Sequence, residues 1–195
     1  MIRVDEVFKT LETERVMLHK VSFVAVMAIA SCAFAADVRP HYGKLTVTEE
    51  LIRREILRLG GDWESGEKTK LVSFIGDKFE SRHFEMLTHV PTLEGFYVDT
   101  CAIDEYALSC LSQVHQLERL DFVECKLEPE SFSLLRSNRE LKELIFDSVI
   151  IPDRLMTELA KLPNLNSISF IDCKGVTKEQ ISTLKAALPK VQISY

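Results

Sequence analysis

LERLDFVECKL, residues 117–127, returns 24 positions later as LKELIFDSVII, residues 141–151. The two stretches share the pattern L-x-x-L-x-F-x-x-C/V-x-L/I. Residues 93–103 (LEGFYVDTCAI) and 165–173 (LNSISFIDC) repeat it, and a less regular unit begins at Thr69. The five units start 24 residues apart each time. This periodicity predicts one structural unit repeated along the chain.

Within each unit, apolar side chains alternate with polar ones, which is typical of a short strand with one buried face. A single such strand cannot bury its apolar side. Stacked units pair their strands into a parallel sheet over one continuous core. The alternation predicts ten core side chains: Val72, Phe74, Phe96, Val98, Leu120, Phe122, Leu144, Phe146, Ile168 and Phe170.

The second half of each unit carries signals of a helix start. Asp104 precedes the segment 105–114, and Pro129 and Pro152 stand where a first helical turn tolerates proline. Thr177 with Gln180 three residues later is a capping-box pattern. These signals predict short helices that face back onto the sheet.

The repeat length and pattern resemble those of the leucine-rich-repeat family. Cys101, Cys125 and Cys173 resemble its cysteine-containing subclass, in which a small thiol fills the slot that holds Asn in most families, whereas Asp77 and Val149 depart from that pattern. The resemblance implies an α/β leucine-rich-repeat solenoid, with a parallel β-sheet on one face and short helices on the other. From Thr48 onward, the chain is similar to small exported bacterial members of the family.

Both ends of the array carry segments that we expect to cap it. Residues 36–68 read as a leader followed by a capping helix and hairpin, with a capping box from Thr46 and a helix end at Gly60. Residues 69–190 hold the five repeats, and residues 191–195 form a terminal strand. Either Val191 and Ile193 or Val191 and Ser194 face inward there.

Residues 1–35 have the form of a secretory signal peptide. An apolar run from Val21 to Ala35 follows Lys20 and ends in an A-x-A cleavage site, which predicts export to the periplasm, cell envelope or extracellular space. The true start is then expected at Met17. Two alternatives are a single membrane anchor and lipidation at Cys32 in a loose lipobox.

Composition and motifs restrict the function. The 195 residues carry a net charge of −6 and a pI near 5.5, which argues against nucleic acid, and the length fits a single domain. No catalytic or metal-binding motif is found, so we expect no enzyme activity, cofactor or metal. His83, His89 and His115 are expected as solvated surface residues, and the repeated cysteines as free thiols.

Two functions remain from different classes. The first is a monomeric scaffold that binds a protein or peptide partner through its strand face; the second is a structural envelope protein without a discrete ligand. The outward strand positions make a mixed apolar and charged face, expected to be flat and without a pocket. β-Branched residues also occur there simply because strands favour them. The candidate binding residues are Tyr97, Asp99, Arg119, Asp121, Val123, Ile145, Asp147 and Ile171.

Overall fold

A computed structural model describes residues 46–65, 70–76 and 78–195. They belong to the second of two units into which the chain divides, His41–Tyr195. The predicted signal peptide and leader, and Asp77, lie outside the described residues. In the part that is described, no helix is both long and apolar enough to cross a membrane.

The described chain begins with a helix and a hairpin, as predicted. Helix α3 (Val47–Arg58) starts with a capping box, in which the Glu49 N–H donates to Thr46 Oγ1 at 3.1 Å and the Thr46 N–H donates to Glu49 Oε2 at 2.8 Å. Gly60, at φ +87°, ends this region in the left-handed conformation that glycine adopts without strain. The antiparallel strands β1 (Gly61–Ser65) and β2 (Lys70–Phe74) follow.

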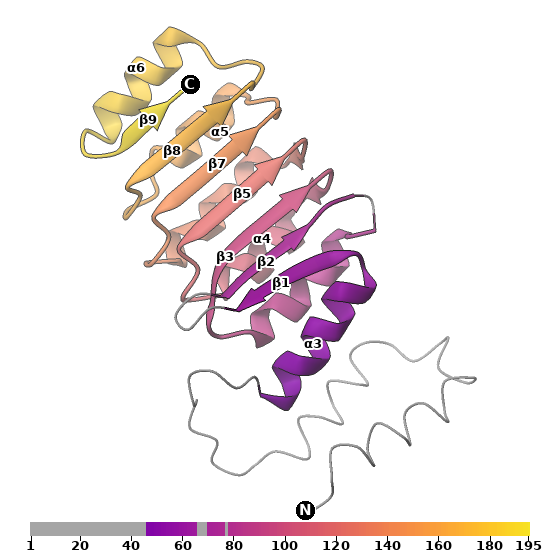
Figure 1. The fold of residues 1–195 in the computed structure, drawn as a ribbon. Helices are drawn as coiled ribbons and strands as arrows, with labels where there is room; N and C mark the ends of the chain where they lie inside the picture. The colour runs from indigo at the N-terminus through magenta and orange to yellow at the C-terminus, as the bar shows by residue number, and fades with distance from the viewer. Residues whose placement is uncertain (1–45, 66–69, 77) are drawn as a thin grey trace, which may run out of the picture. The chain divides into compact units, whose positions relative to one another are not determined.

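A mostly parallel sheet organises the rest, so the predicted α/β class with a parallel sheet is confirmed. Its strand order is β1-β2-β3-β5-β7-β8-β9, and every pair after β1–β2 is parallel (Figure 1). Phe96 pairs with Leu120, Leu120 with Leu144 and Leu144 with Ile168, each 24 residues on. The further strands are β3 (Leu93–Asp99), β5 (Arg119–Val123), β7 (Glu143–Asp147), β8 (Ser167–Ile171) and β9 (Gln192–Ser194).

The segments between parallel strands are short helices that cover one face of the sheet (Figure 1). They are η2 (Ser81–His89), α4 (Glu105–Ser112), η3 (Pro129–Ser137), α5 (Asp153–Leu159) and α6 (Lys178–Ala187). The predicted caps form, since Asp104 accepts from the Ala107 N–H at 2.8 Å and Thr177 accepts from the Gln180 N–H at 3.2 Å. The η2 and η3 segments are 3₁₀ helices, a distinction that the sequence pattern did not make. A separate small sheet pairs β4 (Ala102–Ile103) with β6 (Lys126–Leu127).

The core lies between the sheet and these helices. All ten side chains predicted from the alternation are buried, which confirms the register, because a slip of one residue would turn them all to solvent. The rings of Phe122 and Phe146 stack at 5.7 Å and those of Phe146 and Phe170 at 5.6 Å. At the C-terminus Ile193 is buried and Ser194 exposed, so Ile193 is the inward residue of the terminal strand.

One turn recurs after successive strands. Residues at 24-residue spacing adopt positive φ there: Gly76, Thr100, Glu124, Ser148 and Asp172. The backbone N–H groups of Thr100, Glu124 and Ser148 each donate at 2.9 Å to a carbonyl of the next strand in the sheet. The repeated turn thus extends the hydrogen bonding between units beyond the strand itself.

Cysteine side chains follow three of these turns and contact the preceding unit. The thiols of Cys101, Cys125 and Cys173 lie 3.3, 3.5 and 3.3 Å from backbone carbonyl oxygens of Phe79, Val98 and Phe146, in that order. These three cysteines and Cys110 are free thiols. Each thiol therefore acts as a weak hydrogen-bond donor toward the backbone of the preceding unit.

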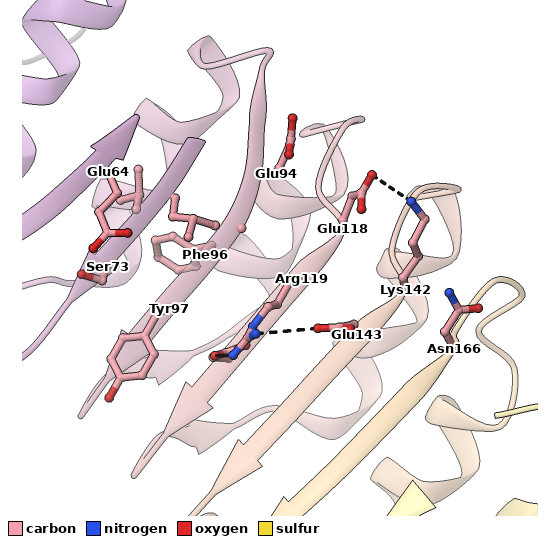
Figure 2. A pocket seen from close by; sticks show the side chains of 14 residues that line it. Glu64, Ser73, Glu94, Phe96, Tyr97, Glu118, Arg119, Lys142, Glu143 and Asn166 are labelled. Carbon is pink, nitrogen blue, oxygen red and sulfur yellow. Dashed lines mark hydrogen bonds and ion pairs between the residues drawn. The ribbon is translucent and has the colours of Figure 1, made fainter. Parts of the chain in front are cut away.

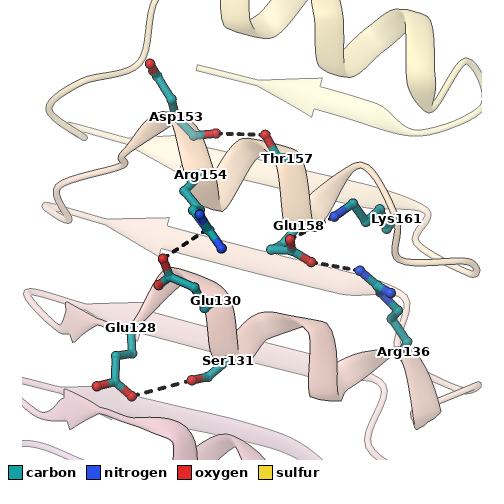
Figure 3. A network of polar contacts seen from close by, with 9 residues as sticks. All are labelled: Glu128, Glu130, Ser131, Arg136, Asp153, Arg154, Thr157, Glu158 and Lys161. Atoms are coloured by element: carbon teal, nitrogen blue, oxygen red, sulfur yellow. Dashed lines mark hydrogen bonds and ion pairs between the residues drawn. The ribbon is translucent and has the colours of Figure 1, made fainter.

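An ionic network joins two neighbouring helical segments (Figure 3). The buried Glu158 of α5 pairs with Arg136 of η3 at 2.8 Å and with Lys161 at 2.8 Å, while Arg154 of α5 pairs with Glu130 of η3 at 2.9 Å. The hydrogen bond from Lys161, and then that from Arg136, lower the pKa of Glu158. The network holds η3 and α5 side by side on the helical face.

Candidate functional site

The sheet face opposite the helices carries a hollow of about 580 Å³ (Figure 2). It lies toward the starts of the central parallel strands. The expectation of a flat face without a pocket is therefore wrong. The lining residues are Glu64, Leu71, Val72, Ser73, Glu94, Gly95, Phe96, Tyr97, Glu118, Arg119, Asp121, Lys142, Glu143 and Asn166.

The depression arises at Gly95, an outward position of β3. Gly95 pairs with Leu71 on one side and Arg119 on the other, and it has no side chain to fill the space between them. The Leu71 side chain, 38% exposed, reaches over the glycine into the place that a Cβ atom would occupy. Leu71 thus takes the place of the missing side chain and forms an apolar floor, while longer side chains stand around this position as walls.

A two-point ion pair forms one wall of the hollow. Arg119 Nε donates to Asp121 Oδ1 at 2.8 Å and Arg119 Nη2 to Asp121 Oδ2 at 2.7 Å, while Arg119 Nη1 lies 3.8 Å from Glu143 (Figure 2). The hydrogen bond with Asp121 raises the pKa of Arg119. Asp121 is only 8% exposed, although it stands at an outward position of its strand. The arginine covers it, because residues two apart on a strand lie on the same face.

The rim of the hollow is built from a row that recurs every 24 residues: Glu94, Glu118, Lys142 and Asn166. The N–H of each later member donates to the carbonyl of the member before it, at 2.7 to 2.8 Å, so the row is held by backbone hydrogen bonds. Lys142 Nζ pairs with Glu118 Oε1 at 2.8 Å. Across the whole lining, five carboxylates face two cationic groups.

Tyr97 stands on the same face, with its ring directed away from the sheet (Figure 2). It is half-buried on the sheet surface. Burial raises the pKa of Tyr97 first, and the nearby carboxylates Asp99, Asp147 and Asp121 raise it further. The hydroxyl thus lies in a negative electrostatic field.

Three of the eight predicted site residues line the hollow: Tyr97, Arg119 and Asp121. The other five lie at outward positions of the strands but outside the lining; these are Asp99, Val123, Ile145, Asp147 and Ile171. Ile171 is 46% exposed, and the remaining four are intermediate in exposure.

The rim row and Gly95 were not predicted from the sequence as parts of the site. Two signals could have found them. The rim residues follow the first leucine of each unit at a constant spacing, and Gly95 is the one glycine in the outward row Leu71, Gly95, Arg119, Glu143 and Ser167.

His83 corrects one further expectation. It is half-buried instead of fully solvated, and its Nδ1 accepts a hydrogen bond from the Glu80 N–H at 2.9 Å at the start of η2. Burial, followed by the charge of Arg82, lowers the pKa of His83. His89 and His115 are exposed, as expected. Over the described ranges, no group of three or more His, Cys, Asp and Glu side chains is placed to hold a metal ion.

No family model matches the chain, and no curated protein matches it. The hollow and its lining are therefore interpreted from their own geometry and charge.

Proposed function

We propose that this chain is a non-enzymatic, exported leucine-rich-repeat protein that binds a protein or peptide through the strand face of its sheet. The observation that carries the proposal is the hollow of about 580 Å³ on that face. Its volume falls within the range of about 300–1,000 Å³ that is typical of ligand clefts. It combines an apolar floor with polar walls and the outward ring of Tyr97, which suits recognition of a polypeptide.

The proposed solenoid architecture is supported by the regular spacing of the units. Strand pairs from Gly95 to Ile171 keep a 24-residue offset, and the left-handed turn recurs with the same period. The thiol contacts of Cys101, Cys125 and Cys173 support a cysteine-containing type of repeat. The helix and hairpin at one end and the short β9 at the other suit the proposed caps.

Export through the segment 1–35 is part of the proposal and rests on its signal-peptide pattern. Cleavage after Ala35 would give a mature chain that begins at Ala36, and mass spectrometry of the exported protein tests this. A mature protein that retains residues before Ser22 would contradict it.

The binding role is tested by comparing two tyrosine variants. Tyr97→Ala alters the hollow, whereas Tyr106→Ala makes the same change on α4, where Tyr106 is 46% exposed. Each variant and the wild type serve as bait for proteins from an envelope extract, after circular dichroism confirms that they are folded. We expect wild type and Tyr106→Ala to capture the same partner and Tyr97→Ala to capture about tenfold less, as expected for an aromatic anchor.

Two results would count against strand-face binding. A partner captured equally by all three proteins would place the binding site elsewhere, and the helical face with His89, His115 and Lys161 would be tested next. The lack of any reproducible partner would favour the alternative, a structural envelope protein without a discrete ligand.

A further inference from the structure

We propose that the segment bound in the hollow is a cationic, extended stretch of polypeptide in which Lys or Arg alternates with apolar side chains. This inference rests on the proposed function, since it names the class of partner for the same face.

The charge of the lining is negative, and its cations are already engaged. Arg119 is bound to Asp121 through two hydrogen bonds, and Lys142 is bound to Glu118. Among the residues that the structure describes, no Lys or Arg side chain forms an ion pair with Glu64 or Glu94. Two carboxylates of the lining therefore have no ion-pair partner among the described residues, whereas both cations of the lining already have one.

The negative field reaches beyond these two carboxylates. Asp99 and Asp147 lie on the same face, close enough to Tyr97 to act on its hydroxyl. At physiological ionic strength, charges interact over about 8 Å before screening, so these groups add to the attraction for a cation at the hollow. An acidic segment would meet repulsion over the same area, and nucleic acid is disfavoured for the same reason.

The geometry suits an extended segment that crosses the strands. The lining comes mainly from four adjacent strands, β2, β3, β5 and β7. Strands in a sheet lie about 4.8 Å apart, so this width is roughly 14 Å and takes about four extended residues. In an extended segment, alternate side chains point the same way, about 6.6 Å apart, so successive cationic side chains can reach carboxylates of different strands.

The floor supplies the apolar part of the recognition. Leu71 is 38% exposed beside Gly95, so an apolar side chain placed over this pair would bury surface that now faces water. Lys and Arg also carry apolar stems that can pack here while their charged ends reach the rim. Alternating cationic and apolar side chains therefore match the hollow better than a uniformly charged segment does.

The test uses three labelled seven-residue peptides in which leucine alternates with lysine, glutamine or glutamate. Binding to the folded protein is measured by fluorescence anisotropy in 20 mM and 300 mM NaCl. We expect the lysine peptide to bind about tenfold more tightly than the glutamine peptide at low salt, the difference to shrink at high salt, and the glutamate peptide to bind least.

Two double variants with equal net charge separate the hollow from the general negative charge of the protein. Glu64→Gln with Glu94→Gln removes the two available carboxylates of the lining. Glu124→Gln with Glu179→Gln removes two exposed carboxylates at other sites, a turn and the first turn of α6. We expect the first pair to weaken binding of the lysine peptide about tenfold and the second to leave it within about twofold.

Three results would overturn the inference. An equal loss in both double variants would show attraction to the whole protein instead of the hollow. Equal binding of the three peptides would remove the charge preference, and no binding of the lysine peptide would remove the proposed ligand class. The proposed function is judged separately, because a partner whose capture depends on Tyr97 but not on Tyr106 supports strand-face binding even if the cationic preference is wrong.

Discussion

Arg119 and Asp121 lie two residues apart on β5, and Nε and Nη2 of the arginine donate to the two carboxylate oxygens of the aspartate at 2.8 and 2.7 Å. Arg119 remains half-exposed while Asp121 is nearly buried. Arg119 was a candidate for contact with a binding partner. In the structure, its guanidinium group is instead hydrogen-bonded to a nearly buried carboxylate of the same strand.

Replacing Arg119 by Ala is therefore expected to destabilise the fold, because Asp121 would lose its charged partner. We expect the free energy of unfolding in urea to fall by about 1–2 kcal/mol. Arg119→Lys keeps the charge without the planar fork and should fall in between. The double variant Arg119→Ala/Asp121→Ala should lose less than Arg119→Ala alone, since no unpaired carboxylate remains. Unchanged stability of Arg119→Ala would show that the pair contributes nothing measurable.

Glu124 offers a stabilising substitution. It stands at φ +48° in the recurrent turn. In this left-handed region, the conformational energy of residues with a side chain is roughly 1–2 kcal/mol higher than in the right-handed region. Glu124→Gly removes this strain but makes the unfolded chain more flexible, so the expected net gain is about 0.5–1 kcal/mol. The matched control is Val123→Gly in the adjoining strand, where the backbone is regular and a loss is expected. Thermal unfolding of both variants tests this prediction, and a lower stability of Glu124→Gly than of the wild type would refute it.

The ion pairs of Glu158 are expected to make a pH-dependent contribution to stability. Its pKa is lowered in the folded protein by Lys161 and Arg136, so its stabilising effect is fully present above the unfolded-state pKa of about 4.3 and is lost as pH falls through the folded-state pKa. We expect Glu158→Gln to lower Tm by about 2–4 °C at pH 7. The difference from wild type should shrink as pH falls below about 4.3 and disappear once pH lies below the folded-state pKa. A Tm difference that stays the same from pH 7 to pH 3 would assign the effect to packing instead of charge.

The buried thiols are expected to react slowly in the native state. Burial raises the pKa of Cys101 to about 12 and that of Cys125 to about 11. At pH 8, roughly one Cys125 side chain in a thousand is then the reactive thiolate. A thiol reagent should label these two only after unfolding, whereas the half-buried Cys173 should react first. Mass mapping of labelled sites tests the order. A denatured, unreduced sample that lacks two thiols would reveal a disulfide.

The inward half of each strand could be predicted from the sequence, but the outward half could not. Alternation fixes which side chains point inward, so Phe74, Leu120 and Phe170 were placed correctly without knowledge of their neighbours. The starts of the helices at Asp104 and Thr177 were also readable, because a capping hydrogen bond involves only residues a few positions apart.

The hollow depends on residues that are distant in the sequence. Leu71, Gly95 and Arg119 meet only because three units pair in register, and the shape between them follows from side-chain conformations that no periodicity specifies. The burial of Asp121 has the same origin, since it depends on which way Arg119 turns.

The two outer strands of the sheet bear on whether copies of this protein can polymerise. β1 is the one antiparallel strand, so a parallel strand of a second copy cannot continue the pattern at that edge with the same hydrogen bonding. β9 pairs through only three residues, from Gln192 to Ser194, and offers a short template at the other edge. A regular stack of parallel strands would otherwise invite end-to-end growth into fibres. The reversed first strand and the short last strand therefore reduce the template that each edge of the sheet offers for such growth.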